Sequence, residues 1–240
     1  VILYTARADG KNPIKAWKEH NADLESRCAY LNNLGLKYLE YKSANGTDFK
    51  VELNEDGIFC GGDEKTLKGR VFNPNIPSEE IFTSPKAGAA EGIVYATKPL
   101  SYQGELIENF SVRFQGGKVV EVKAEKGEEL LKQMVSMDEG AGMLGECALI
   151  PFDSPINNSG VLFYNTLFDE NASCHLALGH GFNECLKGYE NYTNDQCKER
   201  GINDSMIHVD FMIGAKDMSI VGITKTGQRV QIFRDGNWAF

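Results

Sequence analysis

A histidine and an aspartate, His208 and Asp210, stand two residues apart in a short apolar segment near the end of the chain. In a β-strand, residues i and i+2 point to the same face, so the imidazole and the carboxylate would project together while Val209 packs the other way. Both groups are good ligands for Zn²⁺. Taken alone, the pair indicates either part of a metal site or a histidine hydrogen-bonded to a neighbouring aspartate.

A second polar group occupies residues 169–175, with the sequence DENASCH. An acidic pair followed closely by a histidine can supply a metal ligand and a general base. The same residues could instead begin a helix, with Asp169 or Asn171 as its N-cap and His175 on the core side. Cys174 and His175 could also form a nucleophilic dyad. Side chains of sequence neighbours diverge in any regular element, so we rank the dyad below the other two interpretations.

Two more acidic positions are of interest. Glu146 lies in an otherwise apolar segment, where a buried carboxylate is costly unless it binds a cation or another partner. The alternative is that Glu146 sits at the exposed start of a strand. Glu79 and Glu80 form an acidic pair in a segment predicted to be a loop, and such pairs are usually solvated.

The elements that must position these residues follow from hydrophobic periodicity. Residues 13–34 have helical spacing, and Gly35 is placed to end that helix. His20, on this charged helix, is expected to face solvent. The chain opens at residues 1–4 with what is predicted to be a strand, and residues 61–92 are predicted to be mainly loop.

The remaining pattern is mostly that of strands joined by turns, with one charged amphipathic helix predicted over residues 125–137. Strands are predicted at 36–41, 49–53, 93–95, 107–114, 119–122, 146–151, 206–213, 220–223 and 230–233. This pattern predicts an α+β fold with a mainly antiparallel curved sheet and flanking helices.

Bulk composition narrows the class of protein. The 240 residues carry a net charge of −9, which argues against nucleic acid and anionic membrane as partners. No apolar run approaches the roughly 20 residues that span a bilayer, and the first residues lack the pattern of a signal peptide. The six cysteines form no CxxC pair, which is typical of reduced thiols in the cytoplasm. We therefore expect a cytoplasmic protein.

Considered together, several stretches resemble the aminopeptidase T family of metallopeptidases, which includes the aminopeptidase S and PepS types. The most specific are FDENASCHLALG and HVDFMIG, in that order, accompanied by IPSEEIFTSP, EGAGMLGECALIP and IFRDGNWAF. The resemblance covers nearly the whole chain. It implies a hydrolase, a metallo-aminopeptidase that removes N-terminal residues from peptides and forms a homodimer. It also implies that residues 1–12 are the end of a missing N-terminal domain or a linker, and that residues 13–240 are the catalytic domain.

Carried over position by position, the resemblance implies two divalent metal ions, Zn²⁺ or Co²⁺, with Mn²⁺ and Mg²⁺ as other candidates. Glu146 would bridge the two ions. The four remaining ligands would be Glu80 and His175 at one ion and His208 and Asp210 at the other. Three carboxylates against two divalent cations leave one positive charge, which favours binding of hydroxide.

Glu170 matches the position of the family's general base. The family has a tyrosine seven residues after its first histidine ligand, where this chain has Phe182, which cannot donate a hydrogen bond to an oxyanion. His180, Tyr189 and Tyr192 are nearby candidates for that donor, and Phe182 and His180 are predicted to contact substrate. Two other functions stay open: an inactive metal-binding or scaffold homologue, which Phe182 favours, and a cysteine-dependent hydrolase.

Overall fold

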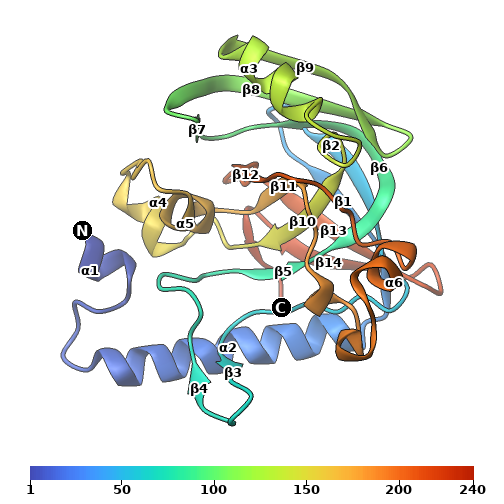
Figure 1. Cartoon of the computed structure of the whole chain (residues 1–240). Coiled ribbons are helices and arrows are strands. Elements are labelled where there is room, and N and C mark those ends of the chain that lie inside the picture. The colour runs from blue at the N-terminus through green and yellow to red at the C-terminus, as the bar shows by residue number, and fades with distance from the viewer.

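The computed structural model describes residues 1–240, and most of its strands belong to two antiparallel sheets (Figure 1). In the larger sheet, alternating residues bury one face, as Leu39 and Tyr41 do in β1 (Leu36–Lys42). Its strands run in the order β15 (Asn237–Trp238), β14 (Arg229–Arg234), β13 (Ser219–Thr224), β1, β2 (Asp48–Leu53), β6 (Pro85–Tyr95), β8 (Glu105–Gln115) and β7 (Leu100–Tyr102), and β9 (Lys118–Lys126) also pairs with β8.

The smaller sheet lies inside the curve of the larger one (Figure 1). Its order is β12 (His208–Met212), β11 (His175–Gly179), β10 (Leu144–Leu149) and β5 (Ile81–Thr83). Every residue of β10 and β11 is buried. One cluster of 36 buried apolar residues draws on both sheets, so the sheets share a single core that holds the small sheet in place.

Helices lie along the edges of the sheets. The longest, α2 (Pro13–Asn33), begins at Asn12, whose side chain accepts a hydrogen bond from the Lys15 amide, and Pro13 suits its first turn. This helix runs beneath β5 in Figure 1 and contacts it. The other helical elements are α1 (Ile2–Thr5), α3 (Glu128–Val135), α4 (Pro155–Ser159), α5 (Thr166–Asp169), η1 (Glu170–Ala172), η2 (Asn183–Cys185), η3 (Tyr189–Asn191) and α6 (Asn194–Glu199).

Most predicted elements are confirmed, but four local predictions were wrong. Residues 1–4 form part of the helical turn α1, because no strand lies beside them and the Thr5 amide bonds to the Val1 carbonyl at 2.9 Å. Residues 61–92 hold β5, the start of β6 and a small hairpin of β3 (Glu64–Lys65) and β4 (Val71–Phe72). Strand β9 continues along β8 to Lys126, so α3 starts only at Glu128.

The fourth difference concerns residues 169–175. Asn165, rather than Asp169 or Asn171, caps the helix, and Asp169 is the last residue of α5. His175 begins strand β11, which the sequence did not predict. The predicted α+β fold with mainly antiparallel strands is confirmed. None of the helices is both long and apolar enough to cross a membrane.

Candidate metal centre

The register of the small sheet brings four polar side chains to one face. Glu146 on β10 stands opposite Ala177 on β11, which stands opposite Asp210 on β12. Residues directly opposite in antiparallel strands share a face, and so do residues two apart in one strand. His175 and His208 therefore join the same face. The methyl group of Ala177 leaves room between the two carboxylates.

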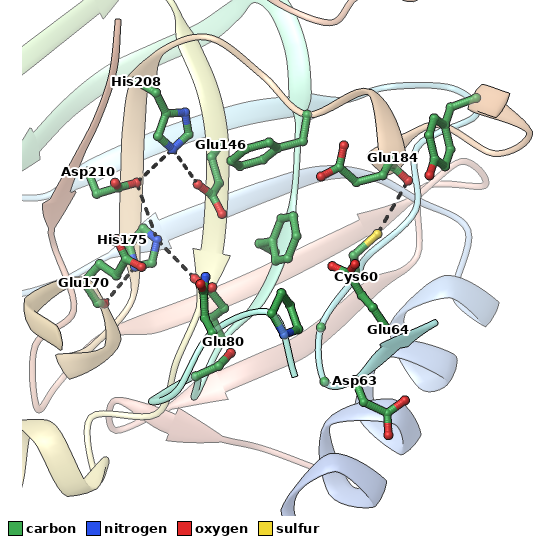
Figure 2. Close-up of a pocket in the computed structure, with 18 of the residues that line it drawn as sticks. Cys60, Asp63, Glu64, Glu80, Glu146, Glu170, His175, Glu184, His208 and Asp210 are labelled. Atoms are coloured by element: carbon green, nitrogen blue, oxygen red, sulfur yellow. Dashed lines mark hydrogen bonds and ion pairs between the residues drawn. The ribbon is translucent and has the colours of Figure 1, made fainter. Parts of the chain in front are cut away.

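Glu80 arrives from the segment immediately before β5, where Phe82 pairs with Ala148 of β10. Two groups of potential ligand atoms result, Glu80–Glu146–His175 and Glu146–His208–Asp210, and within each group the atoms lie within 4.8 Å of one another. Glu146 belongs to both groups. Figure 2 shows these side chains converging, and the structure thus brings together all five residues expected to be ligands.

Both histidines are oriented by main-chain carbonyls. Nδ1 of His175 lies 2.8 Å from the Glu170 carbonyl oxygen, and Nδ1 of His208 lies 2.7 Å from that of His180. A carbonyl can only accept, so Nδ1 of each ring carries the proton. In the neutral rings, Nε2 therefore presents a lone pair to the carboxylates. This is the arrangement in which a histidine binds a metal ion while a second group fixes its tautomer.

The Nε2 atoms face carboxylate oxygens at short range. Nε2 of His208 lies 3.2 Å from Oε2 of Glu146 and 3.2 Å from Oδ1 of Asp210. Nε2 of His175 lies 3.5 Å from Oε2 of Glu80 and 3.8 Å from Oδ1 of Asp210. That Asp210 oxygen is buried and has no hydrogen-bond partner. Lone pairs and negative oxygens gathered this closely need a cation among them.

Without a metal ion, protons must supply that positive charge. Burial raises the pKa of the Glu80 carboxyl well above its usual range, and the carboxylates of Glu146 and Glu170 raise it further. Burial, with Asp210 and Glu146 nearby, raises the pKa of Glu170 to about 9. Burial lowers the pKa of the His208 imidazole, but Asp210 and Glu146 outweigh this effect and raise the pKa to about 11. Carboxylate oxygens and imidazole nitrogens in this arrangement fit divalent cations.

The residues of the centre line a pocket of about 790 Å³. Glu170, the predicted general base, lines the pocket together with the five potential ligands. Across the pocket from them lie Asp63, Glu64 and Glu184 (Figure 2). Sequence patterns do not reveal this second acidic group, because Asp63 and Glu64 lie far along the chain from Glu184 and their spacing matches no motif.

Phe182 lies in this pocket, but the side chain of His180 does not line it. The Phe182 ring is centred 4.8 Å from the His208 ring and 5.5 Å from Phe82. The His180 side chain is half exposed and lies 3.6 Å from a carboxylate oxygen of Asp204, so His180 contributes its carbonyl to the site. Tyr189 lines the pocket.

Tyr192, the other tyrosine considered as a donor, packs instead against the Arg200 guanidinium, 4.1 Å from its ring centre.

The cysteines are poorly placed for nucleophilic catalysis. The Cys174 thiol is buried and donates to the Ile150 carbonyl at 3.3 Å, and burial raises its pKa to about 12. His175 meanwhile bonds to Glu170 rather than to Cys174. Cys60 lines the pocket, but its thiol contacts the Glu184 carbonyl at 3.6 Å and no histidine pairs with it. A Cys–His dyad is therefore absent.

Curated proteins similar to this chain are aminopeptidases. Aminopeptidase AmpS of Bacillus subtilis is 46% identical over 239 residues, which cover 100% of this chain and 58% of that protein. Aminopeptidase T of Thermus aquaticus is 44% identical over 237 residues, which cover 99% of this chain and 57% of that protein. The chain thus spans a little under three-fifths of the length of the curated relatives it matches.

Solved structures give the same relationship. Wild-type AmpT from Thermus thermophilus superposes with a TM-score of 0.89 at 44% identity, over 95% of this chain and 56% of that one. The 2,5-dihydroxypyridine dioxygenase of Pseudomonas putida KT2440 shares the fold, with a TM-score of 0.59 at 14% identity over 92% of this chain and 62% of that one. The family described as thermophilic metalloprotease (M29) matches residues 1–238. The chain therefore belongs to the M29 family of metalloproteases.

Proposed function

We propose that this chain carries the catalytic centre of an aminopeptidase that uses two divalent metal ions to hydrolyse the N-terminal residue from peptides. The observation that carries the proposal is the pair of ligand groups that share Glu146. The aminopeptidases among its relatives support the same activity. A divalent metal is expected of any member of a metalloprotease family, whereas the number of ions and their identity belong to the proposal.

In this proposal, Glu80 and His175 would hold one ion, His208 and Asp210 would hold the other, and Glu146 would contribute to both. When bound, the ions would supply Lewis-acid activation of water and of the scissile carbonyl. The main-chain carbonyls of Glu170 and His180 keep the two imidazoles in the tautomer that binds a cation.

Glu170 is the proposed general base. It lines the same pocket, and burial, with the carboxylates of Asp210 and Glu146 nearby, raises its pKa to about 9 when no cation is present. Bound cations would favour the ionised form, so the same carboxylate could accept a proton from the attacking water and pass it to the leaving amine. The other carboxylates near it are assigned to the ions, which leaves Glu170 as the free base.

The charge of the pocket supports an exopeptidase acting on free N-termini. Asp63, Glu64 and Glu184 face the proposed centre, and Lys65 is the single lysine or arginine in the lining. An acidic cavity raises the local concentration of a cationic group such as the α-ammonium of a peptide. The proposal includes a cytoplasmic homodimer, with residues 13–240 as the catalytic domain and residues 1–12 as the end of a preceding domain or a linker.

The test combines metal content with hydrolysis. The chain should hold two ions per molecule and cleave an aminoacyl arylamide with a free amine but not its N-acetylated form. Glu146→Gln should remove at least one ion and lower kcat about 10³-fold or more, since metal and electrostatic terms of that size are typical. Lys225→Gln, a surface substitution outside the pocket lining, serves as the control.

Two outcomes would contradict the proposal. A Glu146→Gln variant with wild-type kcat and metal content would refute the ligand assignment. A wild-type chain that binds two ions without cleaving any amino-terminal substrate would favour the inactive scaffold instead.

A further inference from the structure

Glu79, the neighbour of Glu80, points away from the metal centre into a separate buried contact. Its side chain is 2% exposed and accepts two hydrogen bonds from the Arg7 guanidinium, 2.6 Å from Nε and 2.5 Å from the terminal nitrogen. A buried carboxylate requires such a partner, and the paired donors of arginine also fix its orientation. The proposed chemistry uses neither residue.

The same segment is tied to the general base. The Glu79 amide donates to Oδ1 of Asn171 at 2.7 Å, and Nδ2 of Asn171, which is fully buried, donates to the Leu167 carbonyl at 2.9 Å. Asn171 follows Glu170, whose carbonyl accepts the hydrogen bond from His175. A continuous series of contacts thus leads from Arg7 to Glu80, Glu170 and His175.

Helix α2 contacts both the 78–80 segment and the residue that precedes Arg7. Nε2 of His20 donates to the Ser78 carbonyl at 2.8 Å and lies 3.7 Å from the Glu79 carboxylate. Nε1 of Trp17 donates to the Ala6 carbonyl at 2.8 Å, directly before Arg7. His20 was predicted to face solvent, but its side chain is 8% exposed, because the 78–80 segment covers it.

Glu80 is held differently from the other proposed ligands of the centre. Those four ligands lie on β10, β11 and β12, which pair with one another along their length. Glu80 precedes β5, so no ladder of main-chain hydrogen bonds reaches it. Its position depends on the contacts that its neighbours make.

We infer that Arg7 is a positioning residue for the half of the metal centre formed by Glu80 and His175, acting through Glu79 and Asn171. This inference rests on the proposed function, since it assumes that both halves bind an ion. In this inference, residues 1–12 help to hold the metal ligands in position and are more than a connection to another domain.

The test is a Co²⁺ titration followed by visible absorption and calorimetry. Arg7→Ala should lower the affinity for one of the two ions about tenfold or more, which is the usual effect of removing a residue that supports a ligand. The affinity for the other ion should stay unchanged. Arg7→Lys keeps the charge but loses the paired donors, so it should fall between Arg7→Ala and wild type. Arg229→Ala is the matched control, because it removes a guanidinium–carboxylate contact with Glu40, 2.8 Å long, from the large sheet.

A double variant makes the assignment specific. In a Glu80→Gln background, adding Arg7→Ala should not change the affinity of the remaining ion, because both changes affect the same half. Thermal unfolding of the metal-free variants verifies that each one folds. If Arg7→Ala does not fold, Arg7→Lys replaces it in the titrations.

The inference would be overturned if Arg7→Ala bound both ions as tightly as wild type, or if it lost the same affinity for both. A wild-type chain that binds fewer than two ions would instead overturn the proposed function, so the two failures are distinguishable.

Discussion

Individual residues of the centre show why it needs a cation. His175 and His208 each donate a hydrogen bond from Nδ1 to a main-chain carbonyl, and their Nε2 atoms face carboxylates. Asp210 adds a buried oxygen with no hydrogen-bond partner. Without a cation, the carboxylate oxygens and the Nε2 lone pairs of the folded chain would repel one another. Such arrangements occur at functional sites, where a bound ligand stabilises them.

Phe182 provides a prediction at this scale. Its ring contacts His208 and lines the pocket, so the hydroxyl of a Phe182→Tyr variant would be added beside the metal centre. If that hydroxyl supplies a missing oxyanion donor, kcat for an aminoacyl arylamide should rise up to about 100-fold.

The control is Phe82→Tyr, which adds a hydroxyl to the same pocket next to Phe182. It should change kcat far less than Phe182→Tyr does, because the Phe182 ring, and not that of Phe82, contacts His208. An unchanged or lower rate for Phe182→Tyr would instead assign the donor role elsewhere, and loss of kcat in Tyr189→Phe would then identify Tyr189.

The residues of the centre become recognisable in the sequence only in combination. HxD at 208–210, an acid before His175 and a Glu in an apolar strand each have an ordinary structural explanation. Their occurrence in one order of motifs indicated the family, and their function as ligands stays a prediction. Asp63, Glu64 and Glu184 were missed because only the tertiary fold brings these distant parts of the chain to one pocket.

At the scale of elements, the β10–β11–β12 register is what assembles the site. Gly179 stands opposite His208, and a Cβ at Gly179 would lie 2.1 Å from the Ile207 carbonyl oxygen. The φ of Gly179 is +103°, a conformation that residues with side chains rarely adopt. Close approach of β11 and β12 at this point therefore requires glycine.

We expect Gly179→Ala to lower the free energy of unfolding by about 2–4 kcal/mol, because backbone strain and a main-chain clash add together. It should also weaken metal binding, since the displaced backbone carries His208. Denaturant unfolding and metal titration measure the two effects.

Gly227→Ala is a matched control for Gly179→Ala. Gly227 has a φ of +86°, but nothing lies within 4 Å of its Cβ position, so only the strain of about 1 kcal/mol should remain. Equal losses of stability in the two variants, or unchanged metal affinity in Gly179→Ala, would contradict the argument about close approach.

The elements themselves were predicted to different extents. Strands β2 and β13 alternate throughout, and β1, β8 and β14 alternate over part of their length beside clear turns, so the sequence reveals them. Strand β11 is short and buried on both faces, which removes the alternation that marks a strand. Strand β5 pairs with β10, a distant part of the chain, through contacts that local sequence does not encode. Strands β3 and β4 form a local hairpin, but each is only two residues long, too short to show a pattern.

For the whole molecule, the fold alone does not specify the reaction. The same architecture occurs in AmpT and, with 14% identity, in a dioxygenase. Function must therefore be argued from the side chains that this fold displays. Their most general consequence is that the stability of the entire domain should depend on protons and metal ions together.

Glu170 and His208 give the sign of that dependence for the metal-free protein. Their folded-state pKa values are about 9 and about 11, above the ordinary 4.5 and 6.5. The folded state then binds these protons more tightly than the unfolded state. The stability they contribute is present at low pH and is lost as pH rises, from about 4.5 to 9 for Glu170 and from 6.5 to 11 for His208.

As the pH rises from 7 to 8.5, the stabilisation contributed by both groups should therefore decrease. The free energy of unfolding of the metal-free protein should fall by at most about 1.4 kcal/mol per pH unit for each group. His20 acts in the opposite direction, because burial lowers its pKa, but its contribution is complete near pH 6.5. Bound metal ions replace the protons, so the metal-loaded protein should lose less stability over the same interval. The gap in Tm between the two forms should widen from pH 7 to 8.5, and Glu170→Gln should reduce the widening because it removes one titrating group. A metal-free protein that gained stability across this interval would show that protons do not stand in for the ions, and that the centre is not built around a positive charge.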